Sequence, residues 1–453
     1  MKSFDGRGEE PLTPLVTTLP GRFFGASFAP APLANTGHTA NKHQHCNLNH
    51  TFVTLPLEMS AAYTDLLRVR GIEKVTLEFT TRCNLKCVYC AVTRPWHRKA
   101  DLDLSAFDEL VREMQALGVK QVQISGGGET TIVKDWDHYL EKLLASGFQV
   151  TIISNLAKPL TARAVRALSY CSEITASCDT VVADMYAEIR KGGDLETFVY
   201  NILRIRAQCA IEQRSAPRLI WNAVASDKMI FDVDQWVAMG LALGVDHFQI
   251  SEMAKYDDLP GMIRVNPLAT LSDEDLARAR ATVEKARRLA QGAGKWFTLL
   301  PAVEEVLRGS RKLMRTEVEL ETGSEGRPVL KSSRTFVQIV GPDGTWHEAP
   351  EPPPTPVTPG KTTKNCLMPW SEAFIWATND LAPCCMYKRI REFRGVGLLE
   401  ALNSEPLVRI REGLLTGNLL HGCAICPMFG SVEVEVFQER VRALFSQTAS
   451  AAT

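Results

Sequence analysis

The sequence lacks a strong charge of either sign, a long apolar run and an abundance of aromatic residues. Its 453 residues include 51 Lys and Arg against 52 Asp and Glu, a net charge of −1, and aromatic residues make up 8%. This balance excludes broad electrostatic binding to nucleic acid or to an anionic membrane surface. No apolar run approaches the ~18 residues that a membrane-spanning helix needs. We therefore expect neither nucleic acid nor a membrane as a partner.

The first ten residues lack the apolar core of a secretory signal, so we expect a cytoplasmic protein. The twelve cysteines of the chain should then stay reduced, because disulfides are rare in that compartment. Reduced cysteines at fixed spacings favour metal or cluster ligation. The length suits one large domain with one or two smaller ones.

Residues 1–70 show weak periodicity and form an N-terminal extension whose structure the sequence does not predict. Good metal ligands gather in one part of it: His38, His43, His45, Cys46 and His50. Their spacing matches no ligand pattern. A polar loop or a segment that caps the substrate is the alternative interpretation.

Strand-like and helix-like segments alternate over residues 71–300. The strands are predicted at 75–79, 121–125, 149–154, 173–177, 219–225 and 247–251. Helical periodicity fills the stretches between them. Strands separated by helices imply right-handed crossovers and a parallel sheet. We therefore predict an α/β fold with a partial or full barrel of six βα units.

Three cysteines follow the first predicted strand. Cys83, Cys87 and Cys90 have the spacing C-x₃-C-x₂-C, which twelve cysteines in a chain of this length would produce by chance about 0.008 times. Three thiolates on one loop can hold three corners of a cubic iron–sulfur cluster and leave its fourth iron open to a ligand. The alternative is a zinc site, which normally has four closed ligands in two pairs from separate parts of the chain.

Polar residues follow the predicted strands at their C-terminal ends, where barrels of this kind carry their chemistry. These residues are Ser125–Glu129, Ser154–Asn155, Ser177–Asp179, Asn222, Gln249, Ser251 and Glu252. The three glycines of the first segment allow the backbone to approach a ligand closely. The last four residues could face a substrate.

The cysteine loop resembles the signature of the radical S-adenosylmethionine (radical SAM) family. In that family, cysteines placed like Cys83, Cys87 and Cys90 bind a [4Fe–4S] cluster, and its open iron takes the amino and carboxylate groups of S-adenosylmethionine. One electron from the cluster then cleaves the sulfonium and yields a 5′-deoxyadenosyl radical. The resemblance implies a partial (β/α)6 TIM-like barrel and an electron donor such as flavodoxin or ferredoxin.

The resemblance also implies cofactor-binding residues around the loop. Tyr89, just before the last cysteine of the loop, would pack near S-adenosylmethionine. Gly127, Gly128 and Glu129 match the Gly-Gly-Glu motif, which contacts the methionine amino group in the family. Thr130 stands where the family often has proline.

Two later strand ends match the family as well. Ser154 ends the third strand, although Leu156 replaces a usual glycine there. Ser177 and Asp179 match polar groups that face the ribose or carboxylate of S-adenosylmethionine. Arg190 resembles a family arginine whose guanidinium fork can pair with the cofactor carboxylate; a solvated surface arginine is the alternative.

A second set of cysteines follows residues 301–365, which we predict to be a linker with a proline-rich segment. The set comprises Cys366, Cys384, Cys385, Cys423 and Cys426. A C-x₂-C pair with further upstream cysteines can form a closed four-thiolate site for zinc or for an iron–sulfur cluster. Between them, residues 373–378 read as a strand and Asn379-Asp380 as a hairpin turn.

The order of these features over residues 366–453 resembles the auxiliary-cluster domain that follows many radical SAM barrels. That domain is called SPASM in its full, seven-cysteine form and twitch in its shortened form, which fits better here. The implied ligands of an auxiliary [4Fe–4S] cluster are Cys366, Cys384, Cys423 and Cys426, with Cys385 in reserve. Asn379 stands where the family often has glycine, and Asn also tolerates a positive φ.

The resemblance therefore predicts an enzyme that reductively cleaves S-adenosylmethionine and abstracts a hydrogen from a C–H bond. Enzymes of this kind oxidise or rearrange small molecules such as sugars and aminocyclitols, or modify ribosomally made peptides. Residues 1–70 lack the pattern of a winged helix that would grip a leader peptide, which favours a small molecule. The alternative of a different class is a non-catalytic zinc- or cluster-binding scaffold.

Overall fold

The computed structural model describes most of the chain between residues 61 and 450. The described residues are 61–95, 97–253, 255–256, 266–323, 326, 328–340, 346–348, 360–384, 387, 391–392, 395–424, 426 and 429–450. The segment from His38 to His50, the prolines of 350–356 and Cys385 lie outside them. Within the described residues, no helix is both long and apolar enough to cross a membrane.

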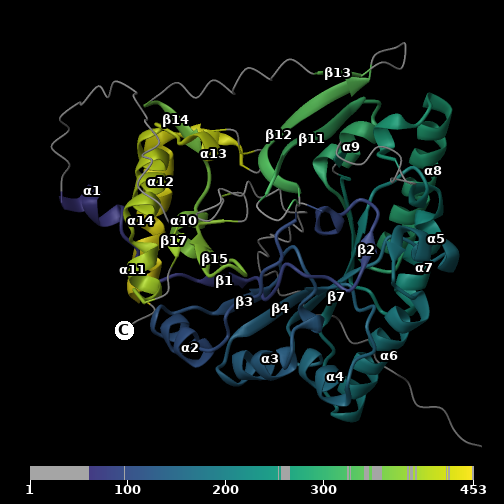
Figure 1. The fold of residues 1–453 in the computed structure, drawn as a ribbon, viewed down its shortest axis with the longest axis horizontal. Helices are drawn as coiled ribbons and strands as arrows, with labels where there is room; N and C mark the ends of the chain where they lie inside the picture. Colours follow the sequence, from purple (N-terminus) through teal and green to yellow (C-terminus); the bar gives the residue numbers. More distant parts are fainter. Residues whose placement is uncertain are drawn as a thin grey trace, which may run out of the picture.

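A ten-stranded sheet forms the centre of the molecule (Figure 1), in the order β10-β8-β7-β5-β4-β3-β1-β15-β16-β17. Its first seven strands are β10 (Trp296–Leu299), β8 (His247–Ser251), β7 (Arg218–Val224), β5 (Glu173–Ser177), β4 (Gln149–Ser154), β3 (Gln121–Ile124) and β1 (Lys74–Leu77). All seven run parallel. The six predicted strands are thus confirmed, and the open sheet matches the predicted partial barrel.

Helices cover the outer face of this sheet in Figure 1. They are α2 (Phe107–Ala116), α3 (Trp136–Ala145), α4 (Ala162–Leu168), α5 (Ala183–Ile189), α6 (Leu195–Ile211), α7 (Val233–Ala242), α8 (Asp273–Gly292) and α9 (Pro301–Leu307). Side-chain caps begin three of them, because Thr161, Asp194 and Ser272 each accept a hydrogen bond from a backbone N–H of the first turn.

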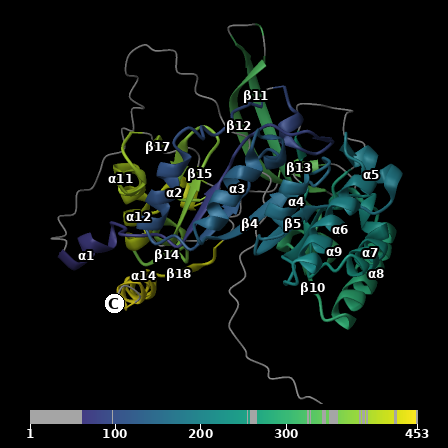
Figure 2. The same cartoon turned by 90° about the horizontal axis from the view of Figure 1, so that it is seen from below.

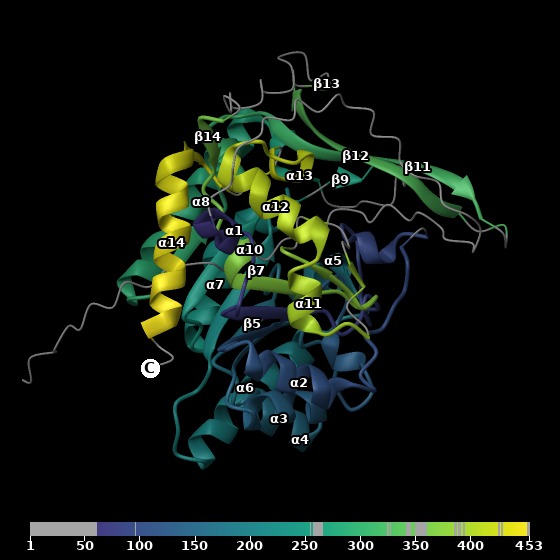
Figure 3. The same ribbon diagram turned by 90° about the vertical axis from the view of Figure 1, so that its left-hand side faces the viewer.

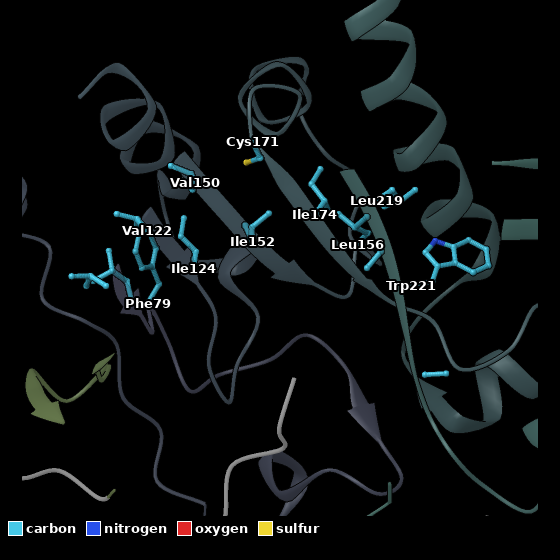
Figure 4. Close-up of a cluster of buried hydrophobic side chains, with 14 of the residues drawn as sticks. Phe79, Val122, Ile124, Val150, Ile152, Leu156, Cys171, Ile174, Leu219 and Trp221 are labelled. Atoms are coloured by element: carbon cyan, nitrogen blue, oxygen red, sulfur yellow. The ribbon is translucent and has the colours of Figure 1, made fainter. Parts of the chain in front are cut away.

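Alternate strand residues supply the core beneath these helices. Figure 4 shows part of this core: Phe79, Val122, Ile124, Val150, Ile152, Leu156, Cys171, Ile174, Leu219 and Trp221, all buried. Because side chains alternate across a strand, the intervening residues face the other side of the sheet. That side is notably polar and includes Thr76, Gln123, Thr151, Thr175, Asn222 and Gln249.

The C-terminal segment continues the central sheet rather than standing apart from it. β15 (Glu372–Ile375) pairs in parallel with β1, and β16 (Asp380–Ala382) returns antiparallel to it, followed by β17 (Arg391–Glu392). The sheet therefore crosses the domain boundary that the sequence placed at residue 366. Asn379, in the turn between β15 and β16, has a φ of 64°, which confirms the positive φ expected there.

Six helices of the described residues pack beside this end of the sheet, where Figure 3 shows α12 and α14 next to each other. The elements are α1 (Ala61–Leu66), α10 (Met368–Ser371), α11 (Leu398–Leu402), α12 (Glu405–Thr416), α13 (His421–Ala424) and α14 (Val434–Ser450), with β14 (Thr362–Lys364) paired to β18 (Ser431–Glu433). Arg411 of α12 is fully buried and donates to the carbonyls of Leu67, Pro369 and Leu402. Burial lowers its pKa to about 10. This one side chain ties the residues before β1 to the C-terminal helices.

A long hairpin occupies much of the stretch predicted to be a linker. β11 (Lys312–Thr322) and β12 (Pro328–Val340) pair antiparallel and extend away from the rest of the molecule in Figure 2. β13 (Trp346–Glu348) adds to one edge, and β9 (Lys255–Tyr256), soon after β8, adds to the other. The linker prediction is therefore wrong for these residues, which satisfy their backbone groups in a sheet.

Candidate active site

The C-x₃-C-x₂-C loop begins just beyond the C-terminal end of β1. Thr81 fixes its start, because its hydroxyl donates to the carbonyl of Arg98 (2.9 Å) and accepts from the backbone N of Ala100 (2.8 Å). A short antiparallel pair fixes its middle, between β2 (Lys86–Cys87) and β6 (Arg190–Lys191). These contacts hold the loop over the strand ends.

Cys83 and Cys90 pack against the small buried cluster that contains Cys87, and none of the three is in a disulfide. Burial raises the pKa of Cys83 to about 11 and that of Cys87 to about 12, and the charge of Cys90 adds to both shifts. The backbone N of Leu85 lies 3.4 Å from Cys83 Sγ, so a backbone donor is in place for a thiolate. The structure thus brings together the three predicted barrel-cluster ligands.

Glu129 joins the glycine-rich loop after β3 to the end of β4. Its carboxylate accepts hydrogen bonds from the Ser154 hydroxyl (2.8 Å) and the backbone N of Asn155 (2.7 Å), and its own backbone N donates to the carbonyl of Arg82 (2.7 Å). A Cβ at Gly128 would lie 2.3 Å from that same carbonyl oxygen. The glycine-rich loop therefore packs directly against the backbone of the cysteine loop.

The end of β4 also reaches the first cysteine. Asn155 Nδ2 donates to Asn84 Oδ1 (2.9 Å) and lies 3.7 Å from Cys83 Sγ. Leu156 has a φ of 47°, the left-handed region that favours glycine, which explains why glycine is usual at this position. Its backbone N donates to Ser154 Oγ (3.1 Å), so the Ser154 hydroxyl is engaged within the protein.

Asp179, beyond the end of β5, is the centre of a buried polar network. Its Oδ2 lies 2.9 Å from Arg190 Nε and accepts from the Tyr89 hydroxyl (2.8 Å), while its Oδ1 accepts from the backbone N of Val224 (2.9 Å). The side chains of Arg190 and Asp179 are 5% and 1% exposed. The surface alternative for Arg190 is therefore wrong: its guanidinium is buried and paired within the protein.

The polar face of the sheet continues across β5, β7 and β8. Ser177 stands opposite Asn222, whose Oδ1 accepts from Ser251 Oγ (2.8 Å) and Gln249 Nε2 (3.3 Å). Their shared partner shows that Gln249 and Ser251 lie on one side of β8. The Ser177 hydroxyl makes no hydrogen bond to another residue that the structure describes, so it is available to a ligand.

The described cysteines of the C-terminal segment also form a group. Burial raises the pKa of Cys366, and the charges of Cys384, Cys423 and Cys426 act in the same direction. Tyr387 Oη lies 3.8 Å from Cys423 Sγ, and the backbone N of Cys426 donates to the carbonyl of Cys423 (3.2 Å). The four thiols predicted as auxiliary ligands are thus neighbours, and their role as ligands stays a prediction.

The first of these two cysteine groups lies in a region that matches a known protein family. Residues 77–209 match the family model of the radical SAM superfamily. Residues 77–209 are a radical SAM domain. This range holds the cysteine loop, the glycine-rich loop, Ser154, Ser177, Asp179 and Arg190.

Two curated relatives are similar to this chain over a little more than a quarter of its length. The GTP 3′,8-cyclase of Pelotomaculum thermopropionicum is 31% identical over 134 residues, 28% of this chain and 40% of that protein. The GTP 3′,8-cyclase of Saccharophagus degradans is 34% identical over 143 residues, 29% of this chain and 41% of that protein. The chain thus spans about two fifths of the length of these relatives.

A solved structure resembles a larger part of the chain. The crystal structure of Streptococcus suis SuiB bound to S-adenosylmethionine has a TM-score of 0.50 and 16% sequence identity, covering 78% of this chain and 70% of that one. At this identity the similarity concerns the fold alone. It supports the α/β architecture around the radical SAM domain.

The residues of the radical SAM domain fit the cofactors of its family, whose members use a [4Fe–4S] cluster and S-adenosylmethionine. Three free thiols occupy one loop, and Gly128 packs against the backbone of Thr80 and Arg82, directly before the first of them. In the part of the chain that the structure describes, no three His, Cys, Asp or Glu side chains are arranged so that they could hold one metal ion together.

Two residues of this region were not singled out by sequence reasoning. Glu78, directly after β1, is buried and accepts hydrogen bonds from the backbone N of Gly127 (2.7 Å) and of Ala377 (3.1 Å). Tyr387 lies against Cys423. Glu78 did carry a local signal, because it is a charged residue in an otherwise apolar run directly before the cysteine loop. No local pattern in the sequence distinguishes Tyr387.

Proposed function

We propose that this chain is a radical SAM enzyme that reductively cleaves S-adenosylmethionine and abstracts a hydrogen atom from an organic substrate. The observation that carries the proposal is the gathering of Cys83, Cys87 and Cys90 on one loop, packed against Gly128 within a radical SAM domain. When bound, the cluster would supply one electron to S-adenosylmethionine, and the resulting 5′-deoxyadenosyl radical would take the substrate hydrogen.

The proposed cofactor contacts come from the strand ends. Gly127 and Gly128 would bring backbone to the methionine end of S-adenosylmethionine, while Glu129 braces their loop through its bonds to Ser154 and Asn155. Rigid support of this kind limits the reorganisation needed when the cofactor binds. In this proposal Ser154 acts through Glu129 and does not contact the cofactor with its hydroxyl.

The polar network of Asp179 would form the next part of the cofactor site. Arg190 and the backbone N of Val224 hold the Asp179 carboxylate, and Tyr89 donates its hydroxyl to it. This arrangement fixes the position of the Tyr89 ring, and Tyr89 directly precedes Cys90 in the chain. Ser177 keeps its hydroxyl available and would face the ribose or carboxylate of S-adenosylmethionine.

The second cysteine group would hold an auxiliary [4Fe–4S] cluster. Its proposed ligands are Cys366, Cys384, Cys423 and Cys426, whose thiols act on one another electrostatically. Such a cluster could accept an electron from the product radical or help to position the substrate. Zinc is the alternative, because four thiolates also suit a closed zinc site.

The substrate would meet the polar face beside the radical SAM domain. Asn222, Gln249 and Ser251 present amide and hydroxyl groups there, which suit a polar, uncharged partner. The comparisons give no support to a sugar- or aminocyclitol-like substrate, which stays a prediction. A ribosomally made peptide is the second class, and a flavodoxin or ferredoxin is the proposed electron donor.

An anaerobic assay tests the activity. Reconstituted protein given S-adenosylmethionine and dithionite should release 5′-deoxyadenosine, and a deuterated substrate should transfer deuterium to that product. Candidate small molecules and precursor peptides are compared as substrates. Bound zinc with no nucleoside product would contradict the proposal and support the non-catalytic scaffold.

A further inference from the structure

Glu78 lies between the glycine-rich loop of the radical SAM domain and the strand that leads to Cys384. Its side chain is 1% exposed, and the residue lies between the end of β1 and the cysteine loop. We propose that Glu78 is a positioning residue that ties the cofactor loop to the β15–β16 hairpin. The assignment rests on the proposed function, because that function defines what the two segments hold.

The first half of the link is the contact with the glycine-rich loop. Glu78 Oε1 accepts a hydrogen bond from the backbone N of Gly127 (2.7 Å). A Cβ at Gly126 would lie 2.3 Å from Glu78 Cγ and 2.6 Å from Oε1. Gly126 is therefore required by the Glu78 side chain, whereas Gly128 is required by the cysteine loop.

The second half of the link is the contact with the C-terminal hairpin. Glu78 Oε2 accepts from the backbone N of Ala377 (3.1 Å), and the backbone N of Glu78 donates to the carbonyl of Ile375 (2.9 Å). Ala377 begins the turn that contains Asn379 and leads through β16 to Cys384. One residue directly after β1 thus holds this hairpin through both its backbone and its side chain.

A carboxylate is suited to this place because each of its two oxygens can accept a hydrogen bond. A carboxamide could accept at one oxygen only, and its NH₂ group would face the other backbone N–H. Because both the NH₂ group and the backbone N–H are donors, this buried backbone N–H would be left without a hydrogen-bond acceptor. Glu78 therefore couples the two segments in a way that glutamine, of nearly the same shape, cannot reproduce.

If Glu78 couples the two segments, binding of S-adenosylmethionine at the glycine-rich loop should also reduce the backbone motion of the β15–β16 hairpin. The test measures backbone hydrogen exchange of the reconstituted full chain, with and without S-adenosylmethionine and without reductant. In the natural protein, S-adenosylmethionine should slow exchange in residues 125–129 and also in residues 374–379. In Glu78→Gln it should slow exchange in the first segment only. Without S-adenosylmethionine, the variant should exchange about fivefold to tenfold faster at Gly127 or Ala377, as expected for loss of one hydrogen bond.

Asp246→Asn is the matched control. Asp246 Oδ2 also accepts from a backbone N–H, that of Leu219 (3.0 Å). Asp246, however, directly precedes β8, at the N-terminal ends of the parallel strands, whereas Glu78 directly follows β1, at their C-terminal ends. The same change of carboxylate to carboxamide there should leave both segments unaffected. An equal effect of the control on either segment would overturn the assignment to Glu78.

The outcomes separate this proposal from the proposed function. Slower exchange in residues 125–129 alone in the natural protein would overturn the role of Glu78 while the cofactor site stands. If S-adenosylmethionine changes neither segment, the proposed function fails; unchanged exchange in Glu78→Gln without S-adenosylmethionine would then overturn the link as well. If Glu78→Gln does not fold, the comparison on the natural protein decides.

Discussion

Arg190 and Asp179 form an ion pair inside the protein, with Nε 2.9 Å from Oδ2 and side chains 5% and 1% exposed. Arg190 belongs to β6, which pairs with the cysteine loop, and Asp179 follows β5. Tyr89 is bonded to both, because its hydroxyl donates to Asp179 and accepts from Arg190 Nη2 (3.2 Å). The pair therefore joins the cysteine loop to the strand end that would face the cofactor.

Replacement of Arg190 by Met should reduce the free energy of unfolding by about 3–5 kcal/mol, because the buried carboxylate of Asp179 loses its counter-charge. Urea unfolding of the protein measures the loss. Lys228→Met is the control: Lys228 pairs with Glu188 at 2.8 Å, but both side chains are about one third exposed. That change should cost less than about 1 kcal/mol. Equal losses for the two variants would contradict the account of the Arg190 pair.

The two cysteine groups should respond differently to loss of one thiol. Cys87→Ala should abolish release of 5′-deoxyadenosine, since it removes one of three ligands of the proposed barrel cluster. Cys423→Ala should spare part of that release while it reduces bound iron, because its cluster would be auxiliary. Iron content and nucleoside product are measured on the same samples. Full loss of nucleoside in Cys423→Ala, with the barrel cluster intact, would contradict the division of roles.

Tyr387 should tune the auxiliary cluster through its contact with Cys423, where Oη lies 3.8 Å from Sγ. Here the Cys423 thiol is the donor, but a deprotonated Cys423 that ligates a cluster could only accept from the hydroxyl. A hydroxyl that donates to a ligand sulfur stabilises the more negative, reduced cluster, so Tyr387→Phe should lower the reduction potential. A redox titration followed by electron paramagnetic resonance, on protein whose Cys83, Cys87 and Cys90 are alanine, isolates this cluster. Tyr170→Phe, at an exposed tyrosine, is the control and should leave the potential unchanged. An unchanged potential in Tyr387→Phe would rule out this role.

His247 should make stability depend on pH. Its Nε2 lies 2.9 Å from Thr298 Oγ1, and Arg218 Nη2 lies 3.4 Å from its Nδ1. Burial first, and the charge of Arg218 second, lower the pKa of His247 from 6.5 to about 4. The unfolded chain therefore takes up this proton at a higher pH than the folded protein, and the contribution is present above about 6.5 and lost as the pH falls towards 4.

The size of this effect is measurable. Between pH 7 and pH 4, the free energy of unfolding should fall by roughly 1–2 kcal/mol more in the natural protein than in His247→Gln. Thermal unfolding across this range provides the comparison. Parallel pH profiles for the two proteins would show that His247 does not titrate as described.

Local patterns in the sequence predicted the barrel because they have a local physical cause. Val150 and Ile152 alternate with residues of the opposite face, and that alternation follows from the pleat of β4. Asn379 was likewise marked by its place before Asp380, and it adopts the positive φ expected of it. Such features depend on a few neighbouring residues, and the structure confirms them.

Contacts between distant residues could not be predicted in this way. Glu78 and Ala377 are 299 positions apart, and the parallel pairing of β15 with β1 joins equally remote segments. The β11–β12 hairpin did have a local signal, because charged and apolar residues alternate over residues 317–321. The proline-rich stretch beyond it favours an extended linker instead, and the two local patterns conflict.

The most direct measurement of the central claim is the response of the reduced barrel cluster to S-adenosylmethionine. Protein in which Cys366, Cys384, Cys423 and Cys426 are alanine is reconstituted with iron and sulfide, reduced with dithionite and examined by electron paramagnetic resonance. The account predicts the signal of a reduced [4Fe–4S] cluster that changes when S-adenosylmethionine is added, because its open iron binds the cofactor. The absence of a cluster signal, or a signal that S-adenosylmethionine leaves unchanged, would contradict the claim.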